Sequence, residues 1–192
     1  MMNVAHNIEV TQCLKVLKAG GIILYPTDTI WGIGCDATNA AAIDRIINLK
    51  KRSPEKSMVI LLDSSKNLTK YVAEIPQKAL AFIADTKRPT TVVYSSGRNL
   101  ASNVYSKDGS VAIRIVKHSF CESLIRHFGK PIVSTSANIS NEPAPAYFSQ
   151  INQTVLDGVD YVVNLQHDSK APAVPSTIIK VDDDGNINIL RE

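Results

Sequence analysis

Short apolar runs of strand length alternate with stretches of helical periodicity, and this order limits the possible folds more than any other feature. Residues 21–25 and 131–133 are apolar runs bounded by glycine or proline, which is typical of short buried strands. Asn39 is placed to cap a helix through Leu49, and Gly129 ends another over residues 119–128. Because helices interleave with strands early and strands cluster late, the pattern predicts an α/β fold with a mixed sheet. Parallel pairs are expected in the first half, and an antiparallel edge at the C-terminus.

The remaining periodic segments fit the same scheme. Neither an internal repeat nor a low-complexity tract interrupts them, and residues 1–192 are predicted to form a single domain, since one hydrophobic core commonly serves a chain of this length. Residues 141–145 contain two prolines and are the most loop-like stretch. We expect further helices at residues 8–18, 76–84 and 147–156, and further strands at residues 58–62, 90–94, 110–116, 161–163, 176–181 and 187–190, the last two paired as a hairpin.

The composition excludes several classes of protein. With 44% hydrophobic and 20% charged residues, the chain has the balance of a soluble globular protein. Its apolar runs are far shorter than the roughly 20 residues that cross a bilayer, and its first residues do not resemble a signal peptide, so no membrane partner is expected. Three widely spaced cysteines without a CxxC or Cys/His pattern predict free thiols in a cytoplasmic protein and give no sign of a protein-bound metal site.

Familiar signatures of nucleotide binding and hydrolysis are absent. The chain has no GxxxxGK[ST] loop, no GxGxxG that opens a helix and no HExxH, and no nucleophilic triad is suggested. The net charge of +3 permits an anionic ligand but does not demand nucleic acid. Any nucleotide chemistry must therefore use a binding site of another kind.

Two polar segments each follow a predicted strand, which is where open α/β sheets place ligands. Residues 26–32 set an aspartate between two threonines on a turn that begins with proline. Residues 134–140 carry four hydroxyls and one amide, and such groups can bind phosphate together with backbone N–H groups. Both segments also have a structural interpretation, as an Asx or ST turn leading into a helix and as a plain loop.

Cationic side chains gather where the helix after Asn39 is predicted to end. Lys50, Arg52 and Lys56 form a denser cluster than helix capping requires, and a guanidinium beside ammonium groups suits a polyphosphate. A solvated charged face is an equally good interpretation of this run. Arg114 lies in an otherwise apolar strand, so it must either reach a surface edge or pair with a carboxylate.

Taken in order, these segments resemble the Sua5/YciO/YrdC family, and specifically the short form of its threonylcarbamoyl-AMP synthase branch, which lacks the C-terminal Sua5 extension. The resemblance runs from about residue 8 to residue 191. One departure is the segment before the central strand, where the family often has Pro-Gly-Pro and residues 87–91 read Lys-Arg-Pro-Thr-Thr. The motifs are Pro-Thr-Asp-Thr-Ile-Trp-Gly at residues 26–32, Lys-x-Arg at 50–52 with Lys56, Val-Ala-Ile-Arg at 111–114, Ser-Thr-Ser-Ala-Asn at 134–138, and Ser-Thr-Ile at 176–178 with Arg191.

The resemblance implies a fold, a reaction and partners. The fold is a twisted sheet of parallel and antiparallel strands, flanked by helices around a large basic cavity. The enzyme is a nucleotidyltransferase that condenses L-threonine, bicarbonate and ATP to threonylcarbamoyl-adenylate and pyrophosphate, with Mg²⁺ accompanying ATP and its protein ligands left open. The adenylate would feed the t6A modification of tRNA by a separate transferase complex, and weak binding to tRNA or double-stranded RNA is also implied.

The resemblance also assigns roles to residues. It places Lys50 and Arg52 at the reacting phosphates as catalytic residues. It gives the ATP site Lys50, Arg52, Lys56, Ser110, Ser136, Asn138 and Arg191, and the threonine site Thr29, Arg114, Ser134 and Ser176, of which Arg114 suits the substrate carboxylate.

Two alternatives of other kinds stay open. A non-catalytic RNA-binding module fits the mildly basic charge, although only 6% of residues are aromatic and no RNP-like pattern is present to stack bases. A YciO-like paralogue of unsettled activity would share the fold. Residues 134–138 argue against it, because that branch resembles this loop less well.

Overall fold

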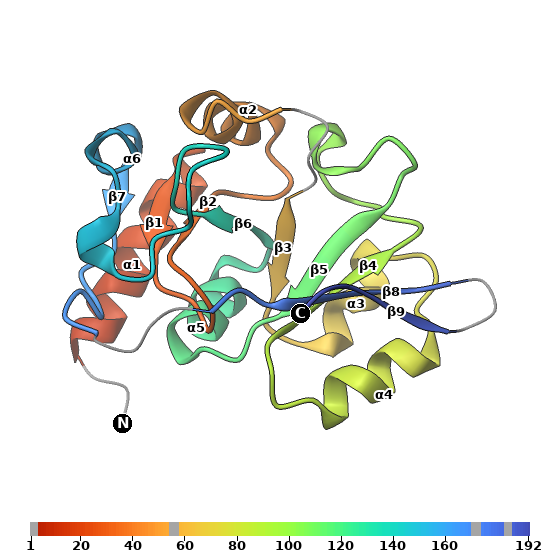
Figure 1. Cartoon of the computed structure of the whole chain (residues 1–192). Coiled ribbons are helices and arrows are strands. Elements are labelled where there is room, and N and C mark those ends of the chain that lie inside the picture. Colours follow the sequence, from red (N-terminus) through yellow and green to blue (C-terminus); the bar gives the residue numbers. More distant parts are fainter. Residues whose placement is uncertain (1–3, 54–57, 170–173, 183–185) are drawn as a thin grey trace.

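The computed structural model describes residues 4–53, 58–169, 174–182 and 186–192. Within these ranges nine strands form one mixed sheet in the order β7-β1-β2-β6-β3-β5-β4-β8-β9, with β7 at one edge and β9 at the other (Figure 1). The predicted α/β fold with a mixed sheet is confirmed. The strands are β1 (Ile23–Tyr25), β2 (Gly32–Gly34), β3 (Val59–Leu62), β4 (Thr90–Tyr94), β5 (Val111–Ile115), β6 (Ile132–Ser136), β7 (Tyr161–Val162), β8 (Thr177–Val181) and β9 (Ile187–Arg191).

The strand directions differ from the prediction at the start of the chain. β1 pairs antiparallel with β2, and β2 antiparallel with β6, whereas the parallel pairs are β1–β7, β3–β5 and β4–β8. The expectation of parallel pairs in the first half is therefore wrong for β1 and β2. Residues 26–31 join these strands, and a parallel pair needs a crossover of about a dozen residues or more. The antiparallel hairpin of β8 and β9 is confirmed.

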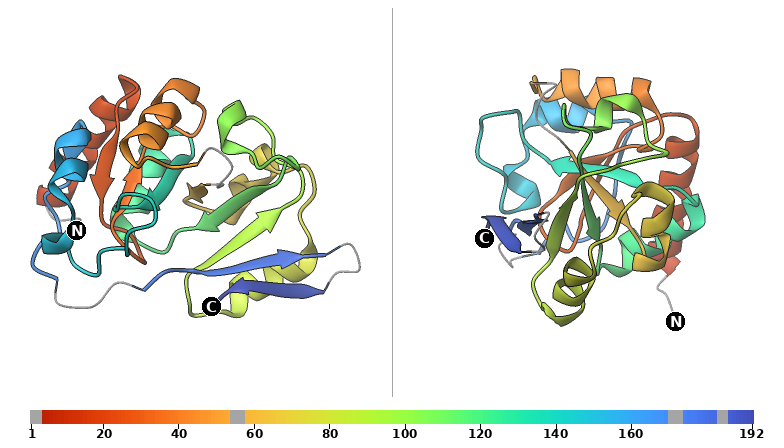
Figure 2. Two further views of the ribbon diagram at one scale, coloured as in Figure 1. Left: turned by 45° about the horizontal axis from the view of Figure 1, so that its top comes forward. Right: turned by 90° about the vertical axis from the view of Figure 1, so that its right-hand side faces the viewer.

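Helices cover both faces of the sheet, and alternate strand residues divide the core between them. Ile23 and Leu61 pack with α1 and α5, whereas Leu24 and Ile60 pack on the opposite face with α2 and α6. Figure 2 shows these two helical layers. The helices are α1 (Val4–Lys18), α2 (Ala40–Leu49), α3 (Leu68–Tyr71), α4 (Gln77–Asp85), α5 (Ser119–Phe128) and α6 (Gln153–Gly158), with short 3₁₀ turns η1 (Ser65–Asn67), η2 (Ser102–Val104) and η3 (Phe148–Gln150). Among the described helices, none is long and apolar enough to cross a membrane.

The capping signals were reliable guides to helix ends. The side chain of Asn39 accepts the N–H of Ala42 at 3.1 Å where α2 begins. Gly129 takes the left-handed conformation, with φ of 74°, where α5 ends. Apolar periodicity alone was less reliable, because the single helix predicted at residues 147–156 is two elements, η3 and α6, and the cap that starts α6 is Asn152.

The polar residues 134–136 belong to a strand and do not follow one. β6 continues through them because its neighbours supply ladder partners: Ser134 lies opposite Val59 of β3, and Ser136 opposite Gly32 of β2. Residues 32–34, for which no strand was predicted, form a strand of their own between β1 and β6. Hydrogen bonding to neighbouring strands makes both segments strands. These neighbours are distant in the sequence, so no local sequence pattern reveals the pairing.

Gly34 allows the backbones and side chains of β1, β2 and β6 to approach closely. A Cβ atom at this position would lie 2.3 Å from the carbonyl oxygen of Val133 and 2.7 Å from the ring of Tyr25. A Cβ at Gly32 would instead meet the rotatable hydroxyl of Ser134 at 2.8 Å. The backbone of β6 cannot yield as a hydroxyl can, so the two glycines differ in what they tolerate.

We predict that Gly34→Ala lowers the free energy of unfolding by on the order of 2 kcal/mol, because overpacking forces the strands apart. Gly32→Ala is the matched control and should cost less than half as much, since only the Ser134 hydroxyl must rotate. Urea denaturation of both variants measures the difference. Equal losses would show that backbone approach at Gly34 does not limit the packing of these strands.

Candidate active site

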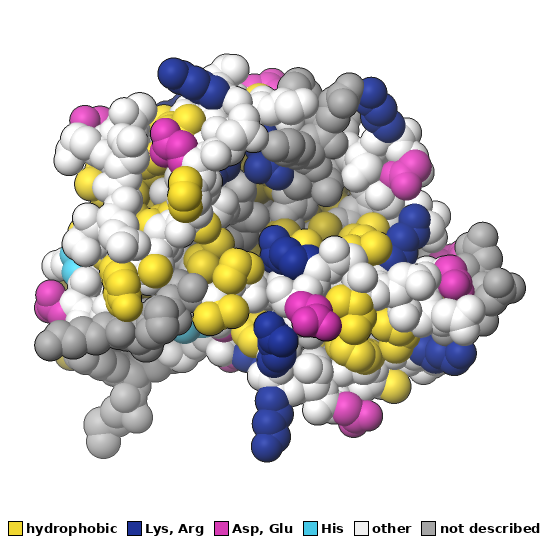
Figure 3. Space-filling model, viewed as in Figure 1, with side chains coloured by type: hydrophobic (Ala, Val, Ile, Leu, Met, Phe, Trp, Pro, Cys, Tyr) yellow, Lys and Arg dark blue, Asp and Glu magenta, His cyan; other side chains and the backbone are white. Residues whose placement is uncertain are grey.

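Three arginines from distant parts of the chain converge on one cavity of about 320 Å³, called the arginine cavity below. Arg52 follows α2, Arg114 lies in β5 and Arg191 ends β9. Figure 3 shows Lys and Arg side chains gathered around the hollow in the middle of this face. Such a concentration of guanidinium groups attracts an anionic ligand of high charge. The remaining lining is Thr29, Ile30, Gly32, Met58, Val59, Ser134, Thr135, Ser136, Ala144, Pro175, Ser176 and Ile178.

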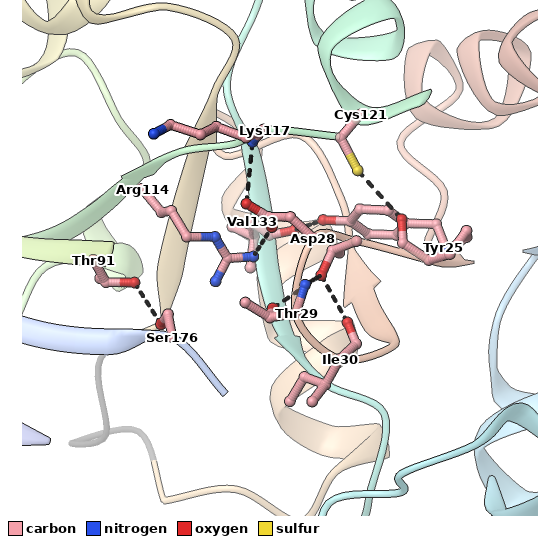
Figure 4. Close-up of polar contacts among 12 residues, drawn as sticks. Tyr25, Asp28, Thr29, Ile30, Thr91, Arg114, Lys117, Cys121, Val133 and Ser176 are labelled. Atoms are coloured by element: carbon pink, nitrogen blue, oxygen red, sulfur yellow. Dashed lines mark hydrogen bonds and ion pairs between the residues drawn. The ribbon is translucent and has the colours of Figure 1, made fainter. Parts of the chain in front are cut away.

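Arg114 is buried in the sheet and faces the carboxylate of Asp28 (Figure 4). Its Nη2 atom lies 3.1 Å from Oδ1 of Asp28, and the two side chains are 5% and 6% exposed. The other carboxylate oxygen, Oδ2, accepts the backbone N–H of Lys117 at 3.1 Å. Of the two alternatives that the sequence left for Arg114, the structure therefore selects pairing with a carboxylate over a position at a surface edge.

Thr27 holds the turn that carries Asp28 and Thr29. Its hydroxyl donates to the carbonyl of Ile30 at 2.8 Å and accepts the N–H of Thr29 at 3.0 Å. Since this uses the one proton of Thr27, the hydroxyl of Thr29, 3.0 Å away, must donate to Thr27. The segment is thus an ST turn, as one interpretation proposed, but it leads into β2 and not into a helix. Thr29 consequently lies in the wall of the arginine cavity.

Helix α2 ends in a Schellman turn, which separates three adjacent cations. The N–H of Lys51 donates to the carbonyl of Asn48 at 3.1 Å, and the N–H of Arg52 donates to that of Ile47 at 2.9 Å. Lys51 takes a left-handed conformation with φ of 49°, which costs a non-glycine residue about 1–2 kcal/mol. As a result Lys51 is exposed, Lys50 is buried and Arg52 lines the cavity.

Lys50 braces the loop after β6 from beneath. Its side chain is 1% exposed, and its ammonium donates to the carbonyls of Ser136 and Asn138. In return, the N–H of Ser140 donates to the Lys50 carbonyl at 2.8 Å. Burial, followed by repulsion from Arg52, lowers the pKa of Lys50 to about 7. The residue predicted at the reacting phosphates is therefore outside the cavity lining and supports the residues that form it.

The side chain of Asn138 points in a different direction from the two serines of β6. Ser134 and Ser136 stand two residues apart on the strand, so both face the arginine cavity. The amide nitrogen of Asn138 instead donates to the carbonyls of Ile139 at 3.0 Å and Glu142 at 2.6 Å. Its side chain thus stabilises the loop, and it is not part of the cavity lining.

Ser176 connects Arg191 to the middle of the sheet. Arg191 donates to the Ser176 carbonyl through Nε at 3.1 Å and Nη2 at 2.8 Å, and the Ser176 hydroxyl pairs with Thr91 at 2.8 Å (Figure 4). Burial, and then the positive charge of Arg114, lowers the pKa of Arg191. The two guanidiniums therefore act on each other, and an anion between them would relieve their repulsion.

Two residues predicted to bind ATP lie elsewhere. Ser110 is buried just before β5 and shares the sheet face of Arg114, but it is not part of the lining of the arginine cavity. Its N–H donates to Asp108 at 3.0 Å. Lys56 lies outside the described residues.

Asp28 and Thr91 contribute to the site and were not predicted to do so. The sequence pattern indicates only a turn residue at Asp28. The useful signal was the arginine in an apolar strand, because a buried guanidinium requires a carboxylate. Sequence separation could not identify which carboxylate meets it, since Asp28 and Arg114 are joined only by the sheet.

A second cavity of about 500 Å³ adjoins the first and shares Thr29, Ile30 and Pro175 with it. Apart from Asp28 and Arg88 its described walls are aromatic or uncharged. The smaller cavity, with three guanidiniums and several hydroxyls, is therefore the better site for chemistry on phosphates.

The donor set of the arginine cavity does not suit a divalent metal ion. Within the described ranges, no three His, Cys, Asp or Glu side chains are gathered as ligands. The described part of the cavity lining offers hydroxyl oxygens and no carboxylate, whereas Mg²⁺ in proteins is usually bound by carboxylates and substrate phosphates. These side chains alone would not hold the ion.

Comparison with known proteins identifies the family of the chain. A family model for Sua5, YciO and YrdC proteins, described as "Telomere recombination", matches residues 15–192. The chain belongs to the Sua5/YciO/YrdC family. A relative from Psychromonas ingrahamii, named threonylcarbamoyl-AMP synthase, is 34% identical over 157 residues, which are 80% of this chain and 82% of that protein.

Two solved structures share the fold of this Sua5/YciO/YrdC protein. P. abyssi Sua5, described as complexed with L-threonine, aligns with a TM-score of 0.81 and 23% identity over 95% of this chain and 53% of that one. The chain thus spans about half the length of that Sua5. E. coli YciO aligns with a TM-score of 0.83 and 19% identity over 97% of this chain and 89% of that one. The mixed sheet that the resemblance implied is confirmed.

The lowered pKa of the buried Lys50 predicts that the free energy of unfolding depends on pH. Because the pKa of Lys50 is about 7 in the folded chain and 10.5 ordinarily, the unfolded chain binds this proton more tightly. Deprotonation therefore favours the folded state, and the contribution of Lys50 to the free energy of unfolding increases between pH 7 and 8. In Lys50→Met this contribution is lost, so the increase measured by urea denaturation at the two pH values should be smaller than in the wild type.

The matched control is Lys51→Met, which removes an exposed charge from the next position and should keep the wild-type dependence on pH. If Lys50→Met also kept the wild-type dependence on pH, Lys50 would not titrate between pH 7 and 8. Its carbonyl partners would then hold it in the charged form over the whole interval.

Proposed function

We propose that this protein is a threonylcarbamoyl-AMP synthase, which forms threonylcarbamoyl-adenylate and pyrophosphate from L-threonine, bicarbonate and ATP. The observation that carries the proposal is the arginine cavity, where Arg52, Arg114 and Arg191 meet the serines of β6. Membership of the Sua5/YciO/YrdC family and the name of the Psychromonas ingrahamii relative support it. The complex of P. abyssi Sua5 with L-threonine fits an amino-acid substrate.

The reaction depends above all on positive charge placed near the phosphates of ATP. The ammonium group of threonine loses a proton, and the resulting amine condenses with bicarbonate with loss of water, which gives a carbamate. A carbamate oxygen attacks the α-phosphorus of ATP, the bond to the β-phosphate oxygen breaks, and pyrophosphate leaves. Negative charge grows on the phosphate oxygens during this step, so fixed cations lower the barrier most.

The three guanidiniums suit different parts of the substrates. Arg52, which follows α2 and lines the cavity, suits the phosphates as a catalytic residue, and Arg191 suits the nucleotide together with Ser136. Arg114, with Thr29, Ser134 and Ser176 around it, suits the carboxylate and hydroxyl of threonine. Lys50 contributes by holding the loop after β6, and Lys56, Ser110 and Asn138 remain proposed ATP ligands through the family resemblance. Mg²⁺ would enter with the phosphates of ATP.

The remaining partners follow from the product. The adenylate is an activated acyl donor, so a separate enzyme must consume it, and we propose the transferase complex that makes t6A in tRNA. Weak direct binding of tRNA or double-stranded RNA is part of the same proposal, as are a cytoplasmic location and a single domain over residues 1–192.

We predict that release of pyrophosphate from ATP requires both threonine and bicarbonate. Without the amine no carbamate forms, so no nucleophile reaches the α-phosphorus. A coupled pyrophosphate assay with each component omitted in turn measures the requirement, and mass spectrometry identifies the adenylate. Equal release without threonine would make the protein a nonspecific ATPase and would contradict the proposal.

Arg52→Ala should lower kcat/KM for ATP about a hundredfold, because it removes a cation from charge that grows in the transition state. Lys51→Ala, the adjacent exposed cation, should lower it less than about fivefold, as expected for a solvated charge. Circular dichroism checks that both variants fold. Similar losses in the two would indicate a diffuse basic patch and favour the RNA-binding alternative.

A further inference from the structure

Arg114 carries hydrogen-bond donors that nothing in the described ranges satisfies. Its Nε and Nη2 atoms are buried and lack a hydrogen-bond partner, as does Oδ1 of Asp28. Arg114 Nη2 and Asp28 Oδ1 are 3.1 Å apart, so they attract as charges, but they are not aligned as a hydrogen bond. Nη2 is the atom that faces Asp28, and with Nε it forms the buried edge of the guanidinium, whereas Nη1 is not among these buried atoms without a partner. Arg114 also lines the arginine cavity, so an anionic ligand there can complete the hydrogen bonds of the guanidinium.

The surroundings of Arg114 limit how its guanidinium can be oriented. Asp28 lies on one side of the guanidinium and the hydrogen-bonded pair of Thr91 and Ser176 on the other (Figure 4). Asp28 is itself fixed, because the N–H of Lys117 donates to its Oδ2 and the turn around it is held by Thr27. The open direction is the arginine cavity, which Arg114 lines.

We propose that Asp28 is a positioning residue, which holds the Nη2 side of Arg114 and so directs the rest of the guanidinium at the carboxylate of the amino-acid substrate. The inference rests on the proposed function. Asp28 also offsets the repulsion between Arg114 and Arg191, which would otherwise drive the buried guanidinium away from this position. A substrate carboxylate accepts charge-assisted N–H bonds from a correctly aimed arginine, and this contact is lost when the guanidinium rotates.

The test compares binding of L-threonine with binding of L-threoninamide, which lacks the carboxylate charge, by isothermal titration calorimetry. Asp28→Asn keeps the shape of the side chain and an acceptor for Lys117, but its amide cannot attract a guanidinium. We expect the wild type to prefer threonine over the amide, and Asp28→Asn to lose about tenfold of this preference, as expected for hydrogen bonds between charged groups. KM for ATP should change less than about threefold.

Three further variants exclude a merely structural effect. The double variant Asp28→Asn/Arg114→Gln should discriminate no less than Arg114→Gln alone, since Asp28 acts through Arg114. Asp28→Glu keeps the charge, so it should retain part of the preference and serves if Asp28→Asn does not fold. Asp157→Asn removes a carboxylate from α6 and should leave the preference unchanged.

The outcomes separate this inference from the function on which it rests. If the wild type binds threonine and Asp28→Asn keeps the full preference over threoninamide, the positioning role is overturned and the proposed function stands. If the wild type binds no threonine, the proposed function is overturned and the role of Asp28 with it. Additive losses in the double variant would overturn the claim that Asp28 acts through Arg114.

Discussion

A positively charged side chain buried in the middle of the sheet determines the arrangement of the segments around it. Taking a guanidinium out of water costs several kcal/mol unless a carboxylate and hydrogen bonds compensate. Arg114 sits on β5, between β3 and β4, and its compensation comes from Asp28 on the turn after β1. The turn, the strand and the C-terminal hairpin therefore meet at one place, and that place is the arginine cavity.

The polar wall of this cavity depends on an unusually close approach of three strands. Gly32 and Gly34 place β2 against β6 with no room for side chains between them, and Ser134 occupies the space that a Cβ at Gly32 would need. Hydroxyl groups are consequently presented from a rigid strand and not from a loop. Rigid elements hold functional groups more precisely than loops do, which suits a reaction governed by the placement of charge.

At the end of α2, local backbone geometry gives adjacent positively charged residues different roles. One left-handed residue, Lys51, reverses the chain so that the residues before and after it enter the protein. Lys50 then supports the loop after β6, while Arg52 reaches the cavity. The short Lys-x-Arg pattern thus couples a structural brace and a candidate catalytic cation, and the charge of Arg52 contributes to the lowered pKa of Lys50.

The sequence by itself determined the α/β class, most element positions, the caps at Asn39 and Gly129, and the polar segments that surround the cavity, because periodicity and capping are local properties of the chain. It also limited Arg114 to two placements, at a surface edge or beside a carboxylate, since burial of an unpaired arginine is costly. Tertiary structure alone decided that Asp28 is that carboxylate, that residues 134–136 lie in a strand, and that Lys50 faces carbonyl oxygens while Arg52 faces the cavity. These outcomes depend on strand pairing and burial, which join residues far apart in the chain and so leave no mark in any short stretch of it.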